Sequence, residues 1–459
     1  MNSRRQFIKN AALAGGGLLL ASSVFANIVL PNRKKVIIIG AGFAGLMAAY
    51  ELDKRGIDFE ILEARDRIGG RVYSHSFGGP DNLIVELGAE WVGEDHHLLR
   101  QLCAEFNLHL DNNQFDTRAI YKGQFYDDLK KIESHEWMVT YEKLLADYKS
   151  LTPEQKDILD HKLDKTDWWR FLVDHGCSGT DLDLRDLIDS TDFGESIREV
   201  SALAAMGEYT SNSPASRNQM DYKITGGNSR LADALMARFE HKIRKNTQVI
   251  KVVQRNKVKV YCTGNYIAEG DRLICTAPTF AVSRIAWDPI LPESMLSAMQ
   301  ALEYARINKN AVLFRKRFWG DDAFDMITDM PGHYFYHGTK NQTQNTKRGV
   351  LISYTIGDKA AVIANQSDAW RADMMDQSLY PAFGSVSQYI DGQELQYWGN
   401  DNFSKGAYAV YGKGQWFDIF PRLNKPHLHT LFAGEHLSDS WGGFMEGALE
   451  TGKAAAEKI

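Results

Sequence analysis

The fold is decided by the stretch Lys35-Val36-Ile37-Ile38-Ile39-Gly40-Ala41-Gly42-Phe43-Ala44-Gly45. Its first five residues form a mostly β-branched run, which is typical of a strand buried on both faces of a sheet. The glycines then have the spacing G-x-G-x-x-G, and a helical pattern follows, with Gly56 placed to end it. A second strand is predicted at residues 58–63, and it ends in an acid. This order predicts the dinucleotide-binding unit of a doubly wound, Rossmann-like α/β fold.

Each residue type in this unit has a physical role. Gly40 permits the tight turn, Gly42 lets backbone N–H groups approach a pyrophosphate, and Gly45 lets the helix pack on the strand. Glu63 stands 23 positions after Gly40 and can accept two hydrogen bonds from a ribose diol. The residues that we predict to bind the cofactor here are Gly40, Gly42, Ala44, Gly45, Glu63, Ala64 and Arg65.

The composition describes an ordinary globular protein. The chain has 459 residues, of which 44% are hydrophobic and 24% charged, and its net charge is −6. At ~150 residues per domain, this length predicts two or three domains. No long basic run is present, so we expect no nucleic-acid partner. The four cysteines are far apart and no H-E-x-x-H motif occurs, so we expect neither a metal site nor a disulfide scaffold.

The amino terminus has the features of an export signal. Residues 1–26 contain no acid and carry the pair Arg4-Arg5 ahead of a weakly apolar stretch, residues 11–24. That stretch is shorter than the ~20 residues that span a bilayer, and Val24-Phe25-Ala26 offers a cleavage site. Residues 3–9 resemble the twin-arginine signal, which is read by the bacterial machinery that exports folded proteins. We therefore expect a periplasmic or secreted protein that acquires its cofactor before export.

A second motif indicates which dinucleotide is bound. Arg67-Ile68-Gly69-Gly70-Arg71 resembles the R-x-G-G-R element of the FAD-containing amine oxidase superfamily, which includes monoamine, polyamine and L-amino acid oxidases. Residues 429–435 and Trp441-Gly442-Gly443-Phe444, with the helical pattern that follows, resemble the carboxyl end of the same family. The resemblance covers nearly all of the chain after the signal, and it favours FAD over NAD.

The resemblance implies further contacts with the cofactor. Gly70 and Arg71 would meet the flavin phosphates and ring, and Glu435 would contact the ribityl chain. The helix after residue 444 would direct the positive end of its dipole at the flavin pyrimidine. The further cofactor-binding residues implied are Gly70, Arg71, Val249, Trp398, Gly434, Glu435 and Phe444.

The family pattern also implies a division of the chain. The FAD-binding domain would comprise residues 33–109, 222–288 and 398–459, and an α+β substrate-binding domain would comprise residues 110–221 and 289–397. The first substrate segment is polar, rich in Trp and Tyr, and predicted to be helical. The alternating apolar residues of 309–314 predict sheet in the second. Further strands are expected at residues 247–253 and 272–275.

Three residues match the family positions that carry the chemistry, which is hydride transfer from the carbon α to an amine nitrogen onto flavin N5. Lys309, ten residues before Trp319, matches a lysine that reaches N5 through a water, and its charge would help electron transfer to oxygen. Tyr408 and Phe444 match two rings that flank the amine, although the second is more usually a tyrosine. The predicted catalytic residues are therefore Lys309, Tyr408 and Phe444.

Glu90 bears on the choice of substrate. Glu90-Trp91 stands where L-amino acid oxidases place an arginine that holds the substrate carboxylate. An acid would instead attract a second ammonium group. We therefore predict that Glu90, Tyr408 and Phe444 bind the substrate, and that an amine or diamine is preferred to an α-amino acid.

The leading prediction is an exported FAD-dependent oxidase of a primary or secondary amine. It would use O2 and give an imine or aldehyde, ammonia or an amine, and H2O2. The alternatives are an L-amino acid oxidase, a flavin desaturase or protoporphyrinogen-oxidase-like enzyme, and a non-catalytic flavoprotein. We expect FAD to be held non-covalently, because Ala407 precedes Tyr408 where monoamine oxidases have the cysteine that is joined to the flavin. A homodimer is a possible assembly.

Overall fold

The glycine-turn unit folds as predicted. Strand β1 (Lys35–Ile39), helix α1 (Phe43–Lys54) and strand β2 (Asp58–Leu62) follow one another, and the two strands pair in parallel. Ile37 and Ile38 are fully buried because both faces of the sheet are covered. The chain leaves α1 through Gly56, whose φ of +66° suits a residue without a side chain. The predicted strand, helix and second strand are confirmed.

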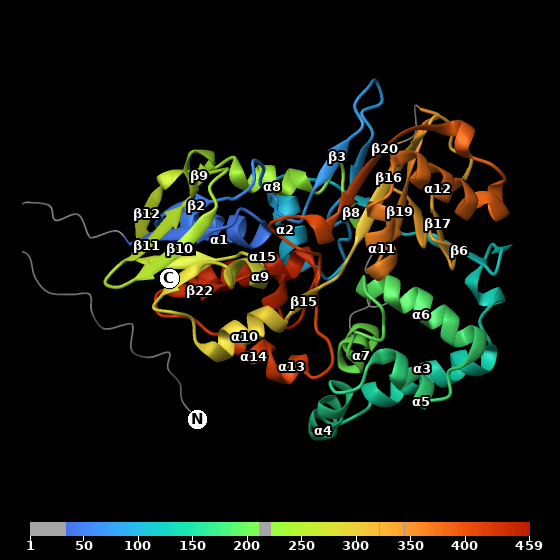
Figure 1. Ribbon diagram of the computed structural model, residues 1–459, viewed down its shortest axis with the longest axis horizontal. Helices are drawn as coiled ribbons and strands as arrows, with labels where there is room; N and C mark the ends of the chain where they lie inside the picture. The colour runs from blue at the N-terminus through green and yellow to red at the C-terminus, as the bar shows by residue number, and fades with distance from the viewer. Residues whose placement is uncertain (1–33, 211–221, 321, 343–345) are drawn as a thin grey trace, which may run out of the picture. The chain divides into compact units, whose positions relative to one another are not determined.

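Three distant parts of the chain build one parallel sheet with the order β22-β13-β1-β2-β9 (Figure 1). The added strands are β9 (Ile243–Arg244), β13 (Arg272–Cys275) and β22 (Thr430–Phe432). Each pairs with its neighbour in parallel, so the carboxyl ends of all five strands lie at one edge. Open α/β sheets bind their ligands at that edge. The α/β fold class and the predicted strand at 272–275 are confirmed.

Helices cover one face of this sheet and a second sheet covers the other. Helix α1 packs against α15 (Met445–Glu457) and α8 (Ser229–Met236). A Cβ on Gly452 of α15 would lie 2.1 Å from the Ala44 carbonyl oxygen, so only glycine permits this approach. The opposite face packs on the four-stranded sheet β12-β11-β10-β14. These strands are β10 (Val249–Gln254), β11 (Val258–Cys262), β12 (Ile267–Gly270) and β14 (Ala286–Asp288).

A separate seven-stranded sheet has the order β20-β16-β19-β18-β17-β6-β7. Its strands are β6 (Asp116–Tyr121), β7 (Gln124–Tyr126), β16 (Asn308–Phe314), β17 (Phe324–Thr328), β18 (Tyr334–His337), β19 (Gly349–Thr355) and β20 (Ile390–Tyr397). Helices α11 (Gly357–Ala364) and α12 (Asp368–Phe383) lie beside it (Figure 1). The predicted strand at 309–314 is confirmed as β16, every residue of which is buried.

The prediction that residues 110–221 are helical is wrong for residues 110–126. Strands β5 (Leu110–Asn112), β6 and β7 come first, and β6 pairs in parallel with β17. Ile120 is fully buried through this pairing with a strand about 200 positions later. The helices that follow are α3 (His135–Lys149), α4 (Pro153–Leu163), α5 (Trp168–Asp174), α6 (Gly179–Phe193) and α7 (Ala202–Thr210).

The computed structural model describes residues 34–210, 222–320, 322–342 and 346–459. The predicted export signal therefore lies outside the described residues. Within those ranges, no helix combines the length and apolar character needed to cross a membrane. The division into an FAD-binding and a substrate-binding domain stays a prediction, although each large sheet takes its strands from the segments assigned to one of them.

Candidate active site

A large cavity opens at the carboxyl edge of the parallel sheet and continues to the seven-stranded sheet. Its volume is about 1250 Å³, and residues from all five predicted segments line it. Every predicted site residue is among them except Gly45. Gly45 lies instead against the turn, where a Cβ would be 2.0 Å from the Gly40 carbonyl oxygen. The fold thus brings together site residues from Gly40 to Phe444.

One end of the cavity has the features of a dinucleotide site. Helix α1 follows Gly42 without a side-chain cap and has no acid in its first turn, which suits a pyrophosphate. A Cβ on Gly70 would lie 3.2 Å from Gly42 Cα, so two glycines form this wall. Glu63 accepts the Ala41 N–H through Oε2 (2.7 Å) and the Arg65 N–H through Oε1 (2.8 Å). Each oxygen keeps a lone pair for a ribose hydroxyl, so these residues fit FAD.

The predicted cofactor-binding arginines are both in ion pairs. Arg65 Nη2 lies 2.5 Å from Asp401 Oδ1, and Arg71 Nη1 lies 2.5 Å from Glu435 Oε1. Burial alone would raise the pKa of Glu435, but Arg71 and His436 outweigh it and hold that pKa below its usual range. Both arginines therefore reach the cavity with their charge already balanced.

The other predicted cofactor residues also lie on the cavity wall. The Trp398 indole N–H donates to the Leu87 carbonyl (2.9 Å), and this side chain is 1% exposed. Gly434 adopts φ +150°, and a Cβ there would lie 2.5 Å from the His436 ring. The remaining predicted cofactor residues on this wall are Ala44, Ala64 and Val249.

Lys309 lies in a buried network rather than on the surface. Its side chain is buried, and its ammonium donates to the Glu86 carbonyl (3.2 Å), the Gly88 carbonyl (2.9 Å) and the Glu90 carboxylate (3.0 Å). Alternation along β16 places Lys309 on the same face as Ala311, towards residues 86–90. All three ammonium protons therefore have protein acceptors. A water-mediated role of Lys309 at the flavin stays a prediction.

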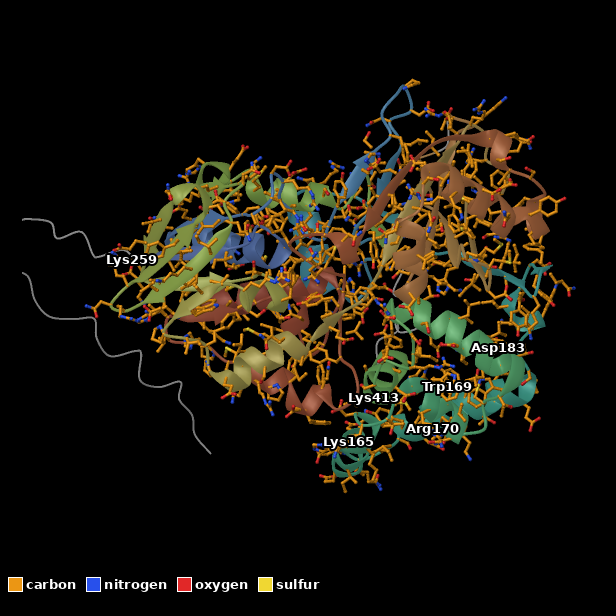
Figure 2. The ribbon with its side chains drawn as sticks, viewed as in Figure 1. Lys165, Trp169, Arg170, Asp183, Lys259 and Lys413 are labelled. Carbon is orange, nitrogen blue, oxygen red and sulfur yellow. The ribbon has the colours of Figure 1, made fainter. Side chains whose placement is uncertain are left out.

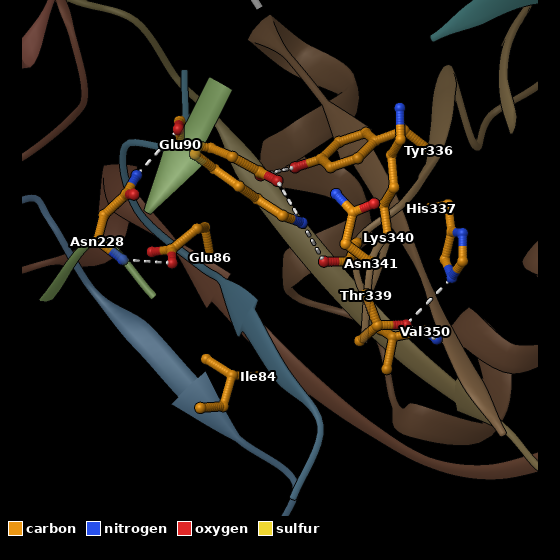
Figure 3. A network of polar contacts seen from close by, with 12 residues as sticks. Ile84, Glu86, Glu90, Asn228, Tyr336, His337, Thr339, Lys340, Asn341 and Val350 are labelled. Atoms are coloured by element: carbon orange, nitrogen blue, oxygen red, sulfur yellow. Dashed lines mark hydrogen bonds and ion pairs between the residues drawn. The ribbon is translucent and has the colours of Figure 1, made fainter. Parts of the chain in front are cut away.

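Glu90, predicted to attract a second substrate ammonium, is already paired within the protein, and its role in substrate binding stays a prediction. Glu90 is 2% exposed, and its Oε2 accepts from Lys309 and from the Tyr336 hydroxyl (2.6 Å; Figure 3). The Lys223 ammonium lies 4.0 Å from Oε1. Two protein cations thus already balance this carboxylate. Neither partner is near Glu90 in sequence, so the local motif could not reveal them.

A second buried carboxylate, Glu86, belongs to the same network. It accepts the Ser74 hydroxyl (2.9 Å) and the Asn228 backbone N–H (2.8 Å; Figure 3). Burial, reinforced by the charge of Glu90, raises the pKa of Glu86 to about 7. Burial also lowers the pKa of Lys223, although both carboxylates oppose that change. Two acids and two lysines are therefore enclosed behind this part of the cavity.

Tyr408 and Phe444, the predicted aromatic pair, both line the cavity. The Tyr408 hydroxyl donates to the Asp192 backbone carbonyl, and its ring lies so close to Gly443 that a Cβ there would be 2.9 Å from Cδ2. The Phe444 ring meets the His96 ring edge-on, with centroids 5.3 Å apart. Contacts with other protein groups thus hold both rings in place. Their action on an amine stays a prediction.

Three acids that the sequence analysis did not single out line the other end of the cavity. Asp192 lies in the last turn of α6, Glu208 lies in α7 and Asp325 lies in β17. Burial raises the pKa of Asp192 to about 7, with help from Asp189, and burial alone raises that of Glu208 to about 7. Asp192 is one of five acids in α6, so nothing in the local sequence distinguished it.

Comparison with known proteins decides the family. Residues 43–459 match the family described as flavin containing amine oxidoreductase. The chain belongs to this family. It is therefore an oxidoreductase that acts on CH–NH2 or CH–NH groups, and its cofactor is FAD, which the glycine turn and Glu63 fit.

Curated relatives cover more than nine-tenths of this chain. The L-amino-acid oxidase of Vipera ammodytes ammodytes is 25% identical over 467 residues, covering 93% of each chain. The L-amino acid dehydrogenase of Synechocystis is 24% identical over 465 residues, covering 92% of this chain and 94% of its own.

Solved structures of this family share the fold. A putrescine oxidase bound to putrescine superposes with a TM-score of 0.81 at 21% identity, and the cyclohexylamine oxidase of Brevibacterium oxydans IH-35A does so with 0.81 at 22%. In both cases 93% of this chain and 98% of the other are covered. At this identity the likeness establishes the architecture and not the substrate.

Proposed function

We propose that this protein is an FAD-dependent amine oxidase. Its substrate would be a primary or secondary amine, and O2 would be the electron acceptor. The products would be an imine or the aldehyde formed by its hydrolysis, ammonia or a smaller amine, and H2O2. One observation carries the choice of an amine over an amino acid, namely the state of the basic groups on the cavity wall.

A substrate carboxylate needs a cationic side chain that has no acidic partner in the protein. Few of the described basic residues that line the cavity meet this condition. Arg65 is paired with Asp401, Arg71 with Glu435, and Lys309 with Glu90. The other lining bases are His436, which contacts Glu435, and Arg284, which follows α9 (Thr279–Val282). An amine makes no such demand, because its reacting nitrogen must be neutral and aromatic faces suffice to orient it.

The side chains of this chain would position the amine and hold the charges. When bound, FAD supplies the acceptor for two electrons and the hydrogen of the α-C–H bond. Tyr408, fixed by its bond to the Asp192 carbonyl, and Phe444, fixed by His96, would orient the amine between their rings. Lys309 would hold a positive charge in the buried network, and such a charge stabilises an anion that develops nearby.

An L-amino acid oxidase is the second candidate, favoured by the name of the Vipera relative, which is 25% identical. In that case Arg284, or an arginine released from its partner, would have to receive the carboxylate. The two candidates make opposite predictions about which substrates are oxidised.

Peroxide release under air tests the proposal. The purified yellow protein should give peroxide with members of an amine panel and should bleach with them in the absence of oxygen. Turnover of L-amino acids alone would favour the second candidate. Bleaching without peroxide would favour a desaturase or dehydrogenase, and neither bleaching nor peroxide would favour a non-catalytic flavoprotein.

We also propose that FAD is held without a covalent bond. Residue Ala407 precedes Tyr408, and none of the four cysteines, all buried, lines the cavity. Finally, we propose export of the folded protein from a bacterial cytoplasm to the periplasm or beyond. Replacement of Arg4 and Arg5 by Lys should retain the protein in the cytoplasm, whereas unchanged export would contradict a twin-arginine signal.

A further inference from the structure

One wall of the cavity is acidic. Among the described residues of 110–210 and 322–397 that line it, three are acids and none is a base. The acids are Asp192, Glu208 and Asp325, and tyrosine rings lie among them. The tyrosines on this part of the wall are Tyr209, Tyr334 and Tyr354.

Asp192 differs from the other acids of α6 in its partners. The cations paired with its neighbours are Lys122 for Asp183 (3.6 Å), Arg198 for Asp186 (2.8 Å) and Arg185 for Asp189 (3.4 Å). In the described part of the chain, the Asp192 carboxylate accepts only the Tyr209 hydroxyl (3.0 Å). It also stands in the last turn of α6, where no base occurs and the helix dipole is negative. A cation in the cavity would relieve this accumulation of negative charge.

Asp325 gives an independent indication of a missing donor. Its side chain is 1% exposed, and its Oδ2 accepts from Thr117 (3.2 Å) and Tyr334 (2.7 Å). Its Oδ1 is buried and has no hydrogen-bond partner among the described residues. A buried carboxylate oxygen without a donor is unfavourable. Because Oδ1 is closed off from the cavity, a cation there would act on the Asp325 carboxylate through its charge and not through a hydrogen bond to Oδ1.

We propose that this acidic wall, Asp192, Glu208 and Asp325, binds a second cationic nitrogen of the substrate. The preferred substrate is then a diamine or polyamine, and this inference rests on the proposed amine oxidase function. Tyr408 links the two ends, because its ring belongs to the predicted amine pocket while its hydroxyl bonds to the Asp192 carbonyl. The tyrosine faces add attraction for an ammonium group. In this proposal the acidic wall, and not Glu90, recognises the second cationic group of the substrate.

The test compares linear diaminoalkanes of increasing length with the n-alkylamines of matched length, using the FAD-loaded enzyme. The best diamine should exceed its matched monoamine in kcat/KM by about tenfold or more. Asp192→Asn should lower the diamine value at least about tenfold more than the monoamine value, and Asp325→Asn should act in the same direction. The matched control is Asp183→Asn, which removes an exposed acid near the start of the same helix (Figure 2). It should leave both values unchanged.

The outcomes separate this inference from the function on which it rests. Equal kcat/KM values for diamines and their matched monoamines, or equal losses of both values in Asp192→Asn, would overturn the acidic-wall site and leave the amine oxidase intact. Oxidation of amino acids alone would overturn the proposed function and this inference with it. If nothing in the panel is oxidised, melting in the presence of each diamine decides. A rise in Tm that Asp192→Asn reduces supports the site, and no rise overturns it.

Discussion

Replacing Lys309 by Met removes one partner of a buried ion pair and leaves the other in place. The ammonium and the Glu90 carboxylate are 3.0 Å apart, and their side chains are 5% and 1% exposed. At an effective dielectric constant of about 20 their attraction is about 5.5 kcal/mol. The loss is limited because Glu90 can instead take up a proton, which costs an ordinary glutamate about 3.7 kcal/mol at pH 7. We therefore expect the variant to lose about 3–4 kcal/mol of unfolding free energy at pH 7.

The pH dependence gives this prediction its sharpest form. The cost of protonating the carboxylate shrinks by about 1.4 kcal/mol for each unit by which the pH falls. The loss in Lys309→Met should therefore decrease to about 1 kcal/mol at pH 5. In a chain of this length, 1 kcal/mol shifts Tm by about 1 °C. Melting of the FAD-loaded proteins, followed by flavin fluorescence, should show a deficit of about 3–4 °C at pH 7 that nearly disappears at pH 5.

The double variant Lys309→Met with Glu90→Gln is the control, because it removes both charges and keeps an acceptor for the Tyr336 hydroxyl. It should be more stable than Lys309→Met alone. A deficit that does not change with pH, or losses in the two single variants that simply add, would refute the reasoning. The ion pair would then contribute little beyond packing.

Four other expectations concern the chemistry and the cofactor. Lys309→Met should slow the reaction of reduced enzyme with oxygen far more than it slows flavin reduction; stopped-flow mixing checks this, and an unchanged rate excludes a role in oxygen chemistry. Acid precipitation should leave the yellow colour in the supernatant, since a yellow pellet means a covalent flavin. Gly45→Val should abolish FAD retention, because a Cβ would lie 2.0 Å from the Gly40 carbonyl oxygen; a normal flavin content in purified protein contradicts this. The ratio of diamine to monoamine kcat/KM should rise as pH increases through about 7, because Asp192 and Glu208, whose pKa values are raised to about 7, then become charged; a flat ratio in a pH profile excludes them.

The pH expectation depends on all the groups around Asp192. The groups that interact with its charge are Asp189 and Arg185 on α6, Glu208 and Tyr209 on α7, Tyr141 on α3, Tyr334 on β18, Tyr354 on β19, and Tyr408. The acids Asp189 and Glu208 oppose ionisation of Asp192, whereas the charge of Arg185 and the hydrogen bond from the Tyr209 hydroxyl favour it. Binding of a cation therefore adds to Arg185 and lowers the pKa from its raised value.

The cofactor end of the cavity could be predicted from the sequence because its constraints are local. Gly40, Gly42 and Glu63 lie within one strand–turn–helix–strand unit, where spacing alone fixes their relative positions. The buried strand β16 was equally visible, since its alternation places Lys309 on a defined face. Residue spacing and apolar alternation predict the local secondary structure of a short segment and the face on which each of its side chains lies.

The substrate end could not be predicted in the same way, because its properties come from pairing across the chain. Glu90 had the correct position on the cavity wall, yet its charge is balanced by Lys309 and Lys223 from two other segments. Asp325 became a candidate only when burial left its Oδ1 without a donor. The strand at 116–121 was missed for the same reason, since its partner β17 begins at Phe324.

The parallel sheet also sets the order of events during synthesis on the ribosome. Strand β13 needs β22, and α1 needs α15, although both partners come more than 150 residues after β13 begins. The apolar side of α1 therefore stays uncovered while most of the chain is being made, which delays folding and calls for chaperones. A chain that stops before Thr430 lacks the edge strand, the closing helix and the Gly434–Glu435 wall of the cavity. Premature termination should thus yield a substrate for proteases rather than a partly active flavoprotein that leaks electrons to oxygen.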